Sequence, residues 1–182
     1  MLHVNEIFYS LQGEGFWTGL PAIFVRLSGC NLKCDFCDTD HLDSRQMTEE
    51  HIIDEVLQYP SKTVILTGGE PLLQPVGPLV DMLHQNGIKV HVETNGTRPC
   101  PPSVDWVTCS PKYKPVIIDR IDELKIVYQG NDVESIRQSC PVASHYFIQP
   151  CSGLNIAETI DYIKDNPHWR LSLQTHKLID IR

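Results

Sequence analysis

Three cysteines in a short loop constrain this chain more than any other feature. Cys30, Cys34 and Cys37 form a C-x3-C-x2-C pattern that directly follows the apolar segment Ala22–Leu27. That segment is typical of a buried strand. In parallel α/β architectures the loops that leave the carboxyl ends of the strands carry the chemistry. We therefore expect the cysteine loop to lie at the active face of the fold.

Three thiolates so close together favour ligation of a cluster. An ordinary [4Fe–4S] centre is held by four cysteines, and this loop supplies three, which leaves one iron open. An open iron can bind a small molecule through an amine and a carboxylate, as S-adenosylmethionine offers. A structural zinc site with a distant fourth ligand is the main alternative, and three incidental core cysteines are another.

Composition narrows the classes of partner. The 182 residues include 23 acidic and 15 basic side chains, for a net charge of −8. This gives no electrostatic reason to expect nucleic-acid binding or attachment to a membrane. The first residues lack the pattern of a signal peptide, and no stretch is apolar enough to span a bilayer, so we expect a cytoplasmic protein with a small-molecule substrate. The four scattered cysteines are expected to be small buried side chains: Cys100, Cys109, Cys140 and Cys151.

Short β-branched segments alternate with loops and helix-like segments, as in α/β proteins. Up to seven strands are predicted, over Ala22–Leu27, Thr63–Thr67, Ile88–Glu93, Asp105–Cys109, Glu123–Tyr128, Tyr146–Gln149 and Arg170–Leu173. Long proline-containing connections at 94–103 and 110–116 stand where a regular alternation would have helices. The expected fold is an incomplete TIM-like barrel of parallel strands with few helices, in one domain over residues 1–182.

Three amphipathic helices are predicted. The first covers Thr48–Gln58, with Thr48 as N-cap and Ile52, Ile53, Val56 and Leu57 on one face. The second covers Val76–Gln85. The third covers Asn155–Asp165, with Asn155 as its cap and Ile156, Ile160 and Ile163 buried.

The cysteine loop resembles the cluster-binding motif of the radical S-adenosylmethionine superfamily, in which an aromatic residue, here Phe36, precedes the last cysteine. A second match is the Thr67–Pro71 segment (TGGEP), which follows a predicted strand. In the superfamily this turn binds the amino group of the methionyl moiety. Physically, two glycines let the backbone approach a ligand closely, although a plain glycine turn is the alternative.

Within the superfamily, the sequence resembles the 7-carboxy-7-deazaguanine synthase family from end to end. The matching segments are residues 6–15 (EIFYSLQGEG), 24–27 (FVRL), 37–39 (CDT), 93–96 (ETNG), 110–112 (SPK), 149–150 (QP) and 173–177 (LQTHK). Some family members carry a longer cysteine loop, whereas this chain keeps the short spacing. The resemblance implies a lyase that contracts the ring of 6-carboxy-5,6,7,8-tetrahydropterin to 7-carboxy-7-deazaguanine with loss of ammonia, in queuosine and deazapurine biosynthesis. S-adenosylmethionine would be regenerated in each cycle.

The resemblance also implies the site residues. The cluster would be held by Cys30, Cys34 and Cys37, and S-adenosylmethionine by Phe36, Gly68, Gly69, Glu70, Ser110, Pro111, Lys112, Gln149, Pro150, Cys151 and Ser152. The substrate would contact Leu11, Gln12, Gly13, Arg26 and Thr67. Strand alternation puts Arg26 on one face with Phe24 and Ser28, and a guanidinium can grip the carboxylate of the pterin. A surface ion pair is the alternative for Arg26, a flexible turn for Gln12, and a hydroxyl bonded to its own backbone for Thr67.

Thr39 corresponds to the magnesium ligand of the family, with substrate oxygens and water completing the coordination sphere. The bare sequence, without the resemblance, favours a role for Thr39 as the cap of the next turn. A homodimer and a flavodoxin or similar reductant are further expectations from the family. A glycyl-radical activating enzyme, which shares the short cysteine loop, is the alternative enzyme, and an electron carrier or zinc module is the non-enzymatic one.

Overall fold

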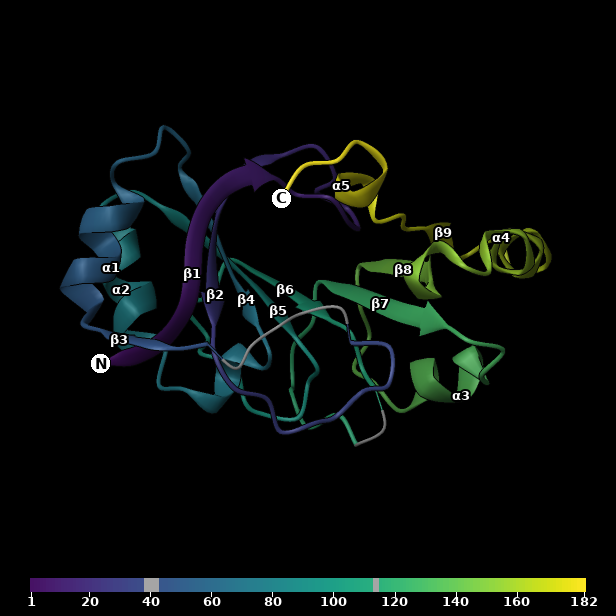
Figure 1. Ribbon diagram of the computed structural model, residues 1–182. Coiled ribbons are helices and arrows are strands. Elements are labelled where there is room, and N and C mark those ends of the chain that lie inside the picture. Colours follow the sequence, from purple (N-terminus) through teal and green to yellow (C-terminus); the bar gives the residue numbers. More distant parts are fainter. Residues whose placement is uncertain (38–42, 113–114) are drawn as a thin grey trace.

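The computed structural model describes residues 1–37, 43–112 and 115–182, and Figure 1 shows their arrangement. Nine strands in these residues form one sheet in the order β3-β1-β2-β4-β5-β6-β7-β8-β9. The strands are β1 (Leu2–Leu11), β2 (Pro21–Leu27), β3 (Arg45–Met47), β4 (Thr63–Gly68), β5 (Lys89–Thr94), β6 (Trp106–Cys109), β7 (Glu123–Tyr128), β8 (His145–Pro150) and β9 (Arg170–Leu171). The seven strands β2, β4, β5, β6, β7, β8 and β9 are parallel to their neighbours in this set. Strand β1 pairs antiparallel with β2 and with β3.

Helices cover only part of the sheet. They are α1 (Glu49–Val56), α2 (Gly77–Gln85), α3 (Val133–Gln138), α4 (Ile156–Asp165) and α5 (Thr175–Leu178), with short 3-10 turns at Pro71–Leu73 and Cys151–Gly153. In Figure 1, α1 and α2 lie beside one end of the curved sheet, and α3 and α4 lie toward the other. No helix in the described residues connects β5 to β6 or β6 to β7. The expected incomplete TIM-like barrel with few helices is confirmed.

The predicted strands are all present, with ends that move by one or two residues. The last one is shorter than expected, because Leu171 and not Leu173 ends it. The limit of seven strands was wrong, since β1 and β3 were missed. In β1 the register shifts between Val4 and Glu6. This bulge breaks the alternation by which a strand is predicted, so that Val4 and Ile7, three residues apart, both belong to the core, while Phe8 is buried on the opposite face, at the cavity.

The predicted helices are confirmed, but two details were wrong. Thr48 caps α1, since its Oγ1 accepts a hydrogen bond from the backbone N–H of His51 at 3.2 Å. Leu57, however, is 45% exposed just beyond that helix. The side chain of Asn155 makes no capping bond to α4, and Ile156 in its first turn is exposed. Ile160 and Ile163, also predicted to be buried, are only half-buried. This helix packs on β8 and on the two-residue edge strand β9, which gives it little sheet to cover.

The apolar core lies between the sheet and the helices on its outer side. In β2 the side chains of Ile23, Val25 and Leu27 are fully buried there, while Phe24 and Arg26 face the concave side, as predicted. Of the four scattered cysteines, only Cys109 is buried, and the other three are partly exposed. No helix in the described residues is long and apolar enough to cross a membrane.

Candidate functional site

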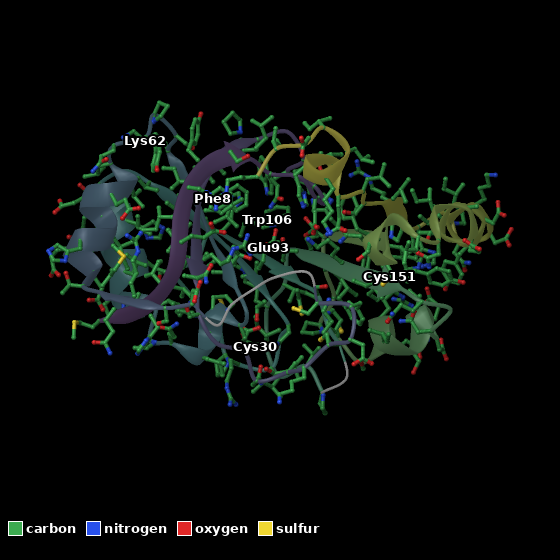
Figure 2. All side chains as sticks on the ribbon, viewed as in Figure 1. Phe8, Cys30, Lys62, Glu93, Trp106 and Cys151 are labelled. Atoms are coloured by element: carbon green, nitrogen blue, oxygen red, sulfur yellow. The ribbon has the colours of Figure 1, made fainter. Side chains whose placement is uncertain are left out.

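A cavity of about 710 Å³ occupies the concave side of the sheet, toward the carboxyl ends of the parallel strands. Its lining comes from the cysteine loop, from the ends of β4 to β8, and from the first and last segments of the chain. Figure 2 shows Phe8, Glu93 and Trp106 near the centre of the molecule, with Cys30 on one side and Cys151 beyond β7. Residues from both halves of the sequence therefore share one chamber.

The three cysteines of the loop all line this cavity, as predicted from their spacing. The backbone N–H of Cys37 donates to the carbonyl of Cys34 at 3.0 Å, and the N–H of Leu32 lies 3.5 Å from the sulfur of Cys30. Burial raises the pKa of Cys34, and the nearby ammonium of Lys112 opposes that shift. No three histidine, cysteine or acidic side chains in the described residues close around a single metal ion. Each cysteine of a [4Fe–4S] centre binds a different iron, so a wider arrangement of thiols fits a cluster.

The double-glycine turn after β4 packs directly on the start of the cysteine loop. A Cβ on Gly68 would lie 2.0 Å from the carbonyl oxygen of Leu27, and one on Gly69 would lie 2.2 Å from that of Gly29. Gly68 also has a φ of 137°. Backbone N–H groups of Gly69 and Glu70 donate to the same two carbonyls at 3.2 and 2.9 Å. Only glycine allows this contact, which fixes the turn against the cluster loop.

Glu70, which was predicted to contact the cofactor, does not line the cavity. Its carboxylate is fully buried and accepts from the hydroxyl of Thr94 at 2.7 Å and from the N–H groups of Leu72 and Asn95 at 3.0 and 2.7 Å. Burial raises its pKa against the effect of these hydrogen bonds. The side chain of Asn95 in turn donates to Asn31 of the cysteine loop at 3.1 Å. Glu70 thus joins the ends of β4 and β5 to that loop.

The opposite wall follows β6 and β8. The cavity is lined there by Ser110, Lys112, Gln149, Pro150, Cys151 and Ser152, whereas Pro111, also predicted, is buried outside it. The N–H of Cys151 donates to the side-chain oxygen of Asn155 at 2.8 Å, and Asn155 donates to the carbonyl of Tyr128 at 2.8 Å. The side chain expected to cap α4 instead holds the turn that follows β8.

Arg26 lines the cavity and also forms an ion pair. Its Nε donates to Glu6 Oε1 at 2.9 Å, and the guanidinium of Arg182 bonds to the other oxygen of Glu6. Both guanidiniums lie over the ring of Phe8, at 5.8 and 4.9 Å from its centroid. Phe8 itself stacks on Phe24 at 5.0 Å. Arg26 thus forms the ion pair that was its alternative interpretation and also lines the cavity, where its contact with a substrate carboxylate stays a prediction.

A buried lysine forms the floor of the cavity. The ammonium of Lys125 lies 2.5 Å from Glu14 Oε2 and 3.6 Å from Glu93 Oε2. Gln12 donates to Glu93 at 2.8 Å, and Gln174 donates to Glu14 at 2.9 Å. Burial acts to lower the pKa of Lys125, but the surrounding carboxylates raise it above its usual value. The floor is charged and polar, and its charges are paired.

Glu123 lies near this lysine, outside the cavity lining. Its Oε2 accepts from the N–H of Phe16 at 3.1 Å, while its buried Oε1 has no hydrogen-bond partner among the described residues. Burial raises its pKa from 4.5 to about 7, against the attraction of Lys125. A cluster of aromatic and histidine rings lies at the amino ends of the neighbouring strands. It consists of Phe16, Trp17, His91, Trp106 and His145.

The last segment of the chain packs on the first turn. Thr175 donates to the carbonyl of Gly13 through its N–H at 2.9 Å and its hydroxyl at 2.7 Å. A Cβ on Gly13 would lie 2.1 Å from the ring of His176. Leu11, Gln12 and Gly13 all line the cavity, as does Thr67 at the end of β4. The turn at 11–13, for which flexibility was the alternative, is held in place by the carboxyl-terminal segment.

Sequence reasoning did not select several lining residues. Glu14, Glu93, Gln174, His176 and Lys177 lie inside segments that resembled the family, so a signal for them existed. No pattern in the sequence indicated Lys125 or Arg182, because each is remote in the sequence from its partners. Thr39, the predicted magnesium ligand, lies outside the described residues.

Comparison with known proteins agrees with this geometry. A family model for the radical SAM superfamily matches residues 24–139. The chain is 60% identical to a 7-carboxy-7-deazaguanine synthase of Bacteroides thetaiotaomicron over the full length of both, and 42% identical to one of Neisseria meningitidis over 96% of this chain and 91% of that protein. The crystal structure of QueE from Escherichia coli is similar with a TM-score of 0.79 at 30% identity, over 96% of this chain and 94% of that one.

Proposed function

Because this chain belongs to the 7-carboxy-7-deazaguanine synthase family of the radical SAM superfamily, we propose that it converts 6-carboxy-5,6,7,8-tetrahydropterin to 7-carboxy-7-deazaguanine. The ring contraction would depend on magnesium and release ammonia, within queuosine and deazapurine biosynthesis. The observation that carries the proposal is one cavity in which the three-cysteine loop faces Arg26 and a floor of paired charges. The substrate offers matching groups, since it has a carboxylate at one end and an aminopyrimidinone at the other.

The cofactors of the superfamily fit the upper part of the cavity. Cys30, Cys34 and Cys37 supply three thiols on one loop, and the glycine turn presents bare backbone beside Cys30. Ser110, Lys112 and the turn after Gln149 offer polar groups across the chamber. When bound, a reduced [4Fe–4S] cluster and S-adenosylmethionine supply a 5′-deoxyadenosyl radical that can abstract the hydrogen at C6 of the pterin.

Arg26 would bind the substrate carboxylate. A guanidinium binds a carboxylate through two parallel hydrogen bonds, which fix its orientation as well as its position. Glu6 accepts a hydrogen bond from Nε of Arg26. The two Nη groups, on the other edge of the guanidinium, would then donate to the substrate carboxylate. With the carboxylate fixed, one C–H bond of the pterin is held toward the cluster side of the cavity.

The floor would recognise the pyrimidinone edge of the substrate. Glu14 and Glu93 present carboxylate oxygens suited to its N–H groups, and Gln12 offers both a donor and an acceptor. Lys125 neutralises both acids and can donate to a carbonyl oxygen. A ring system without these donors would cover the floor without bonding to its remaining carboxylate lone pairs, which costs more than a lost contact in water.

Magnesium binding is proposed through Thr39, with oxygens of the substrate and water as the other ligands. A homodimer, a flavodoxin or similar low-potential reductant, a cytoplasmic location and one domain over residues 1–182 also remain proposals. The edge strand β9, which pairs only with β8 within the described residues, leaves a sheet edge open for a dimer contact. No helix in those residues is long and apolar enough to cross a membrane.

Anaerobic turnover tests the proposed reaction. The purified protein is loaded with iron and sulfide and supplied with dithionite, S-adenosylmethionine and the carboxypterin, with and without magnesium. We expect a product lighter than the substrate by one ammonia, and a lower rate without magnesium. With deuterium at C6 of the substrate, the label should appear in recovered S-adenosylmethionine. The pterin could instead stay unchanged, with 5′-deoxyadenosine formed only when a protein partner is added. That result would favour the alternative, a glycyl-radical activating enzyme.

An Arg26 variant tests the carboxylate contact. We expect Arg26→Met to lower kcat/KM by about 30- to 100-fold, because one charged hydrogen-bonded pair contributes about 2–3 kcal/mol. Arg45→Met is the matched control, since Arg45 pairs with Glu55 outside the cavity. A kcat/KM within twofold of the parent for Arg26→Met would refute the assignment of the carboxylate site.

A further inference from the structure

Lys112 is a half-buried cation that faces the cavity. Its ammonium donates to the hydroxyl of Ser110 at 2.7 Å. Within the described residues no carboxylate forms an ion pair with it, in contrast to Lys125 beneath the same cavity. Burial and the neighbouring Lys125 lower its pKa from the usual value, and the field of Cys34 opposes this. A positive charge that is partly removed from water and has only a neutral partner is costly unless an anion faces it.

The ammonium of Lys112 also lies over the cysteine loop. The nitrogen lies 5.5 Å from the centre of the Phe36 ring, and Phe36 stands between Cys34 and Cys37. The positive charge of Lys112 acts to lower the pKa of Cys34, and the thiolate of Cys34 acts to raise the pKa of Lys112. The lysine therefore lies over the middle of the loop that would hold the cluster.

Its burial sets Lys112 apart from the other lysine at this loop. Lys33 belongs to the loop itself and lines the cavity, but its side chain is exposed. An exposed charge is screened by water and salt, whereas a charge in a low-dielectric environment acts over several ångströms. Lys112 should therefore influence the electrostatics of the loop more than Lys33 does.

We propose that Lys112 tunes the cluster, and that its ammonium over the cysteine loop makes one-electron reduction of the cluster more favourable. One electron passes from a low-potential single-electron donor to the cluster, which gains one negative charge, and no proton is transferred because the ammonium keeps its own. This role rests on the proposed function, since it requires a cluster on the cysteine loop. It goes beyond the contact with S-adenosylmethionine that the family resemblance implies for Lys112, because it holds with no cofactor bound.

A redox titration without S-adenosylmethionine or substrate tests this role. The parent, Lys112→Met, Lys112→Arg and Lys33→Met are loaded with iron and sulfide, and the reduced cluster is followed by electron paramagnetic resonance. At the potential where half of the parent's clusters are reduced, we expect the ratio of reduced to oxidised cluster to fall about tenfold in Lys112→Met. Lys112→Arg keeps the charge and should stay within about threefold of the parent, and Lys33→Met within about twofold.

The outcomes separate this role from its rivals. An unchanged ratio in Lys112→Met, with weaker binding of S-adenosylmethionine, would make Lys112 a cofactor contact alone and overturn the proposal. Iron and sulfide are measured first, and if Lys112→Met does not hold a cluster, Lys112→Gln, which can still bond to Ser110, carries the same comparison. Failure of the proposed function is read from the turnover assay, which this titration does not use. A parent that reduces its cluster but leaves the pterin unchanged loses the proposed function and keeps this role, whereas a parent with no reducible cluster overturns both.

Discussion

The two sides of the cavity are built in different ways. The cluster wall, made of residues 28–37 and the glycine turn at 68–69, is held by backbone hydrogen bonds and by contacts that only glycine allows. The charged floor, made of Gln12, Glu14, Glu93 and Lys125, is held by side chains that carry or bind charge. A substitution that adds side-chain volume should destabilise a wall fixed by backbone contacts. A substitution that removes a charge should destabilise a floor fixed by charges, to an extent that depends on pH. Three substitutions test this contrast.

Removal of the lysine from the floor should have the largest effect. Lys125→Met leaves the carboxylates of Glu14 and Glu93 buried without their cation. Breaking a buried pair on one side costs about 3–5 kcal/mol of the free energy of unfolding. The pKa of Glu14 is lowered in the folded protein, by Lys125 acting against burial, so its contribution is present at neutral pH and is lost as the pH falls.

Chemical denaturation of Lys125→Met at pH 8 and pH 5 measures this effect. We expect the loss relative to the parent to be smaller at pH 5, where the orphaned acids can take up protons. Lys164→Met removes an exposed lysine paired with Asp161 and is the control. Equal losses at both pH values would show that charge does not hold the floor.

Addition of a methyl group to the cluster wall should have the next largest effect. Gly69→Ala places a Cβ 2.2 Å from the carbonyl oxygen of Gly29 and 2.8 Å from the Cβ of Cys30. The resulting shift should cost about 2–3 kcal/mol, in the range found for overpacked sites, and should lower the iron bound after reconstitution. Because no charge changes, the loss should be the same at pH 5 and pH 8.

Gly77→Ala is the matched control for the cluster wall, since a Cβ there meets no atom within 4 Å. Its thermal midpoint and iron content should equal those of the parent. A Gly69→Ala protein that binds iron and unfolds like the parent would contradict the view that this wall is fixed by close backbone contact.

Neutralisation of Glu123 should change the free energy of unfolding least, and it should stabilise the protein where the other two substitutions destabilise it. Burial raises its pKa from 4.5 to about 7, so the folded protein binds a proton there that the unfolded chain has already released between these values. Stability is therefore lost as the pH rises from about 4.5 to about 7. Glu123→Gln should stabilise the protein at pH 8 by roughly 1–2 kcal/mol and have almost no effect near pH 4.5, as thermal unfolding at the two pH values would show. A variant less stable than the parent at pH 8 would mean that Lys125 needs this carboxylate in its ionised form.

The local parts of the site could be predicted from the sequence. Cys30, Cys34 and Cys37 are close in the sequence and enter the cavity together, and Arg26 faces it because strand alternation requires this. The sequence did not indicate that the carboxylate of Glu70 points away from the cavity and accepts hydrogen bonds from Thr94 and Asn95. A residue inside a recognised motif can therefore support the site from outside the cavity. Strand β1 was missed because its bulge removes the alternation on which prediction depends.

The sequence by itself determined the α/β class, the cluster loop and the place of the glycine turn, because strand periodicity and short spacings are properties of neighbouring residues. Only the tertiary structure decided that Lys125 lies between Glu14 and Glu93, that Arg182 shares Glu6 with Arg26, and that Lys112 lies over the cluster loop. These pairs join residues far apart in the chain. The curvature of the whole sheet decides which strand ends lie close together and therefore which charged side chains form pairs. No local pattern in the sequence predicts this curvature.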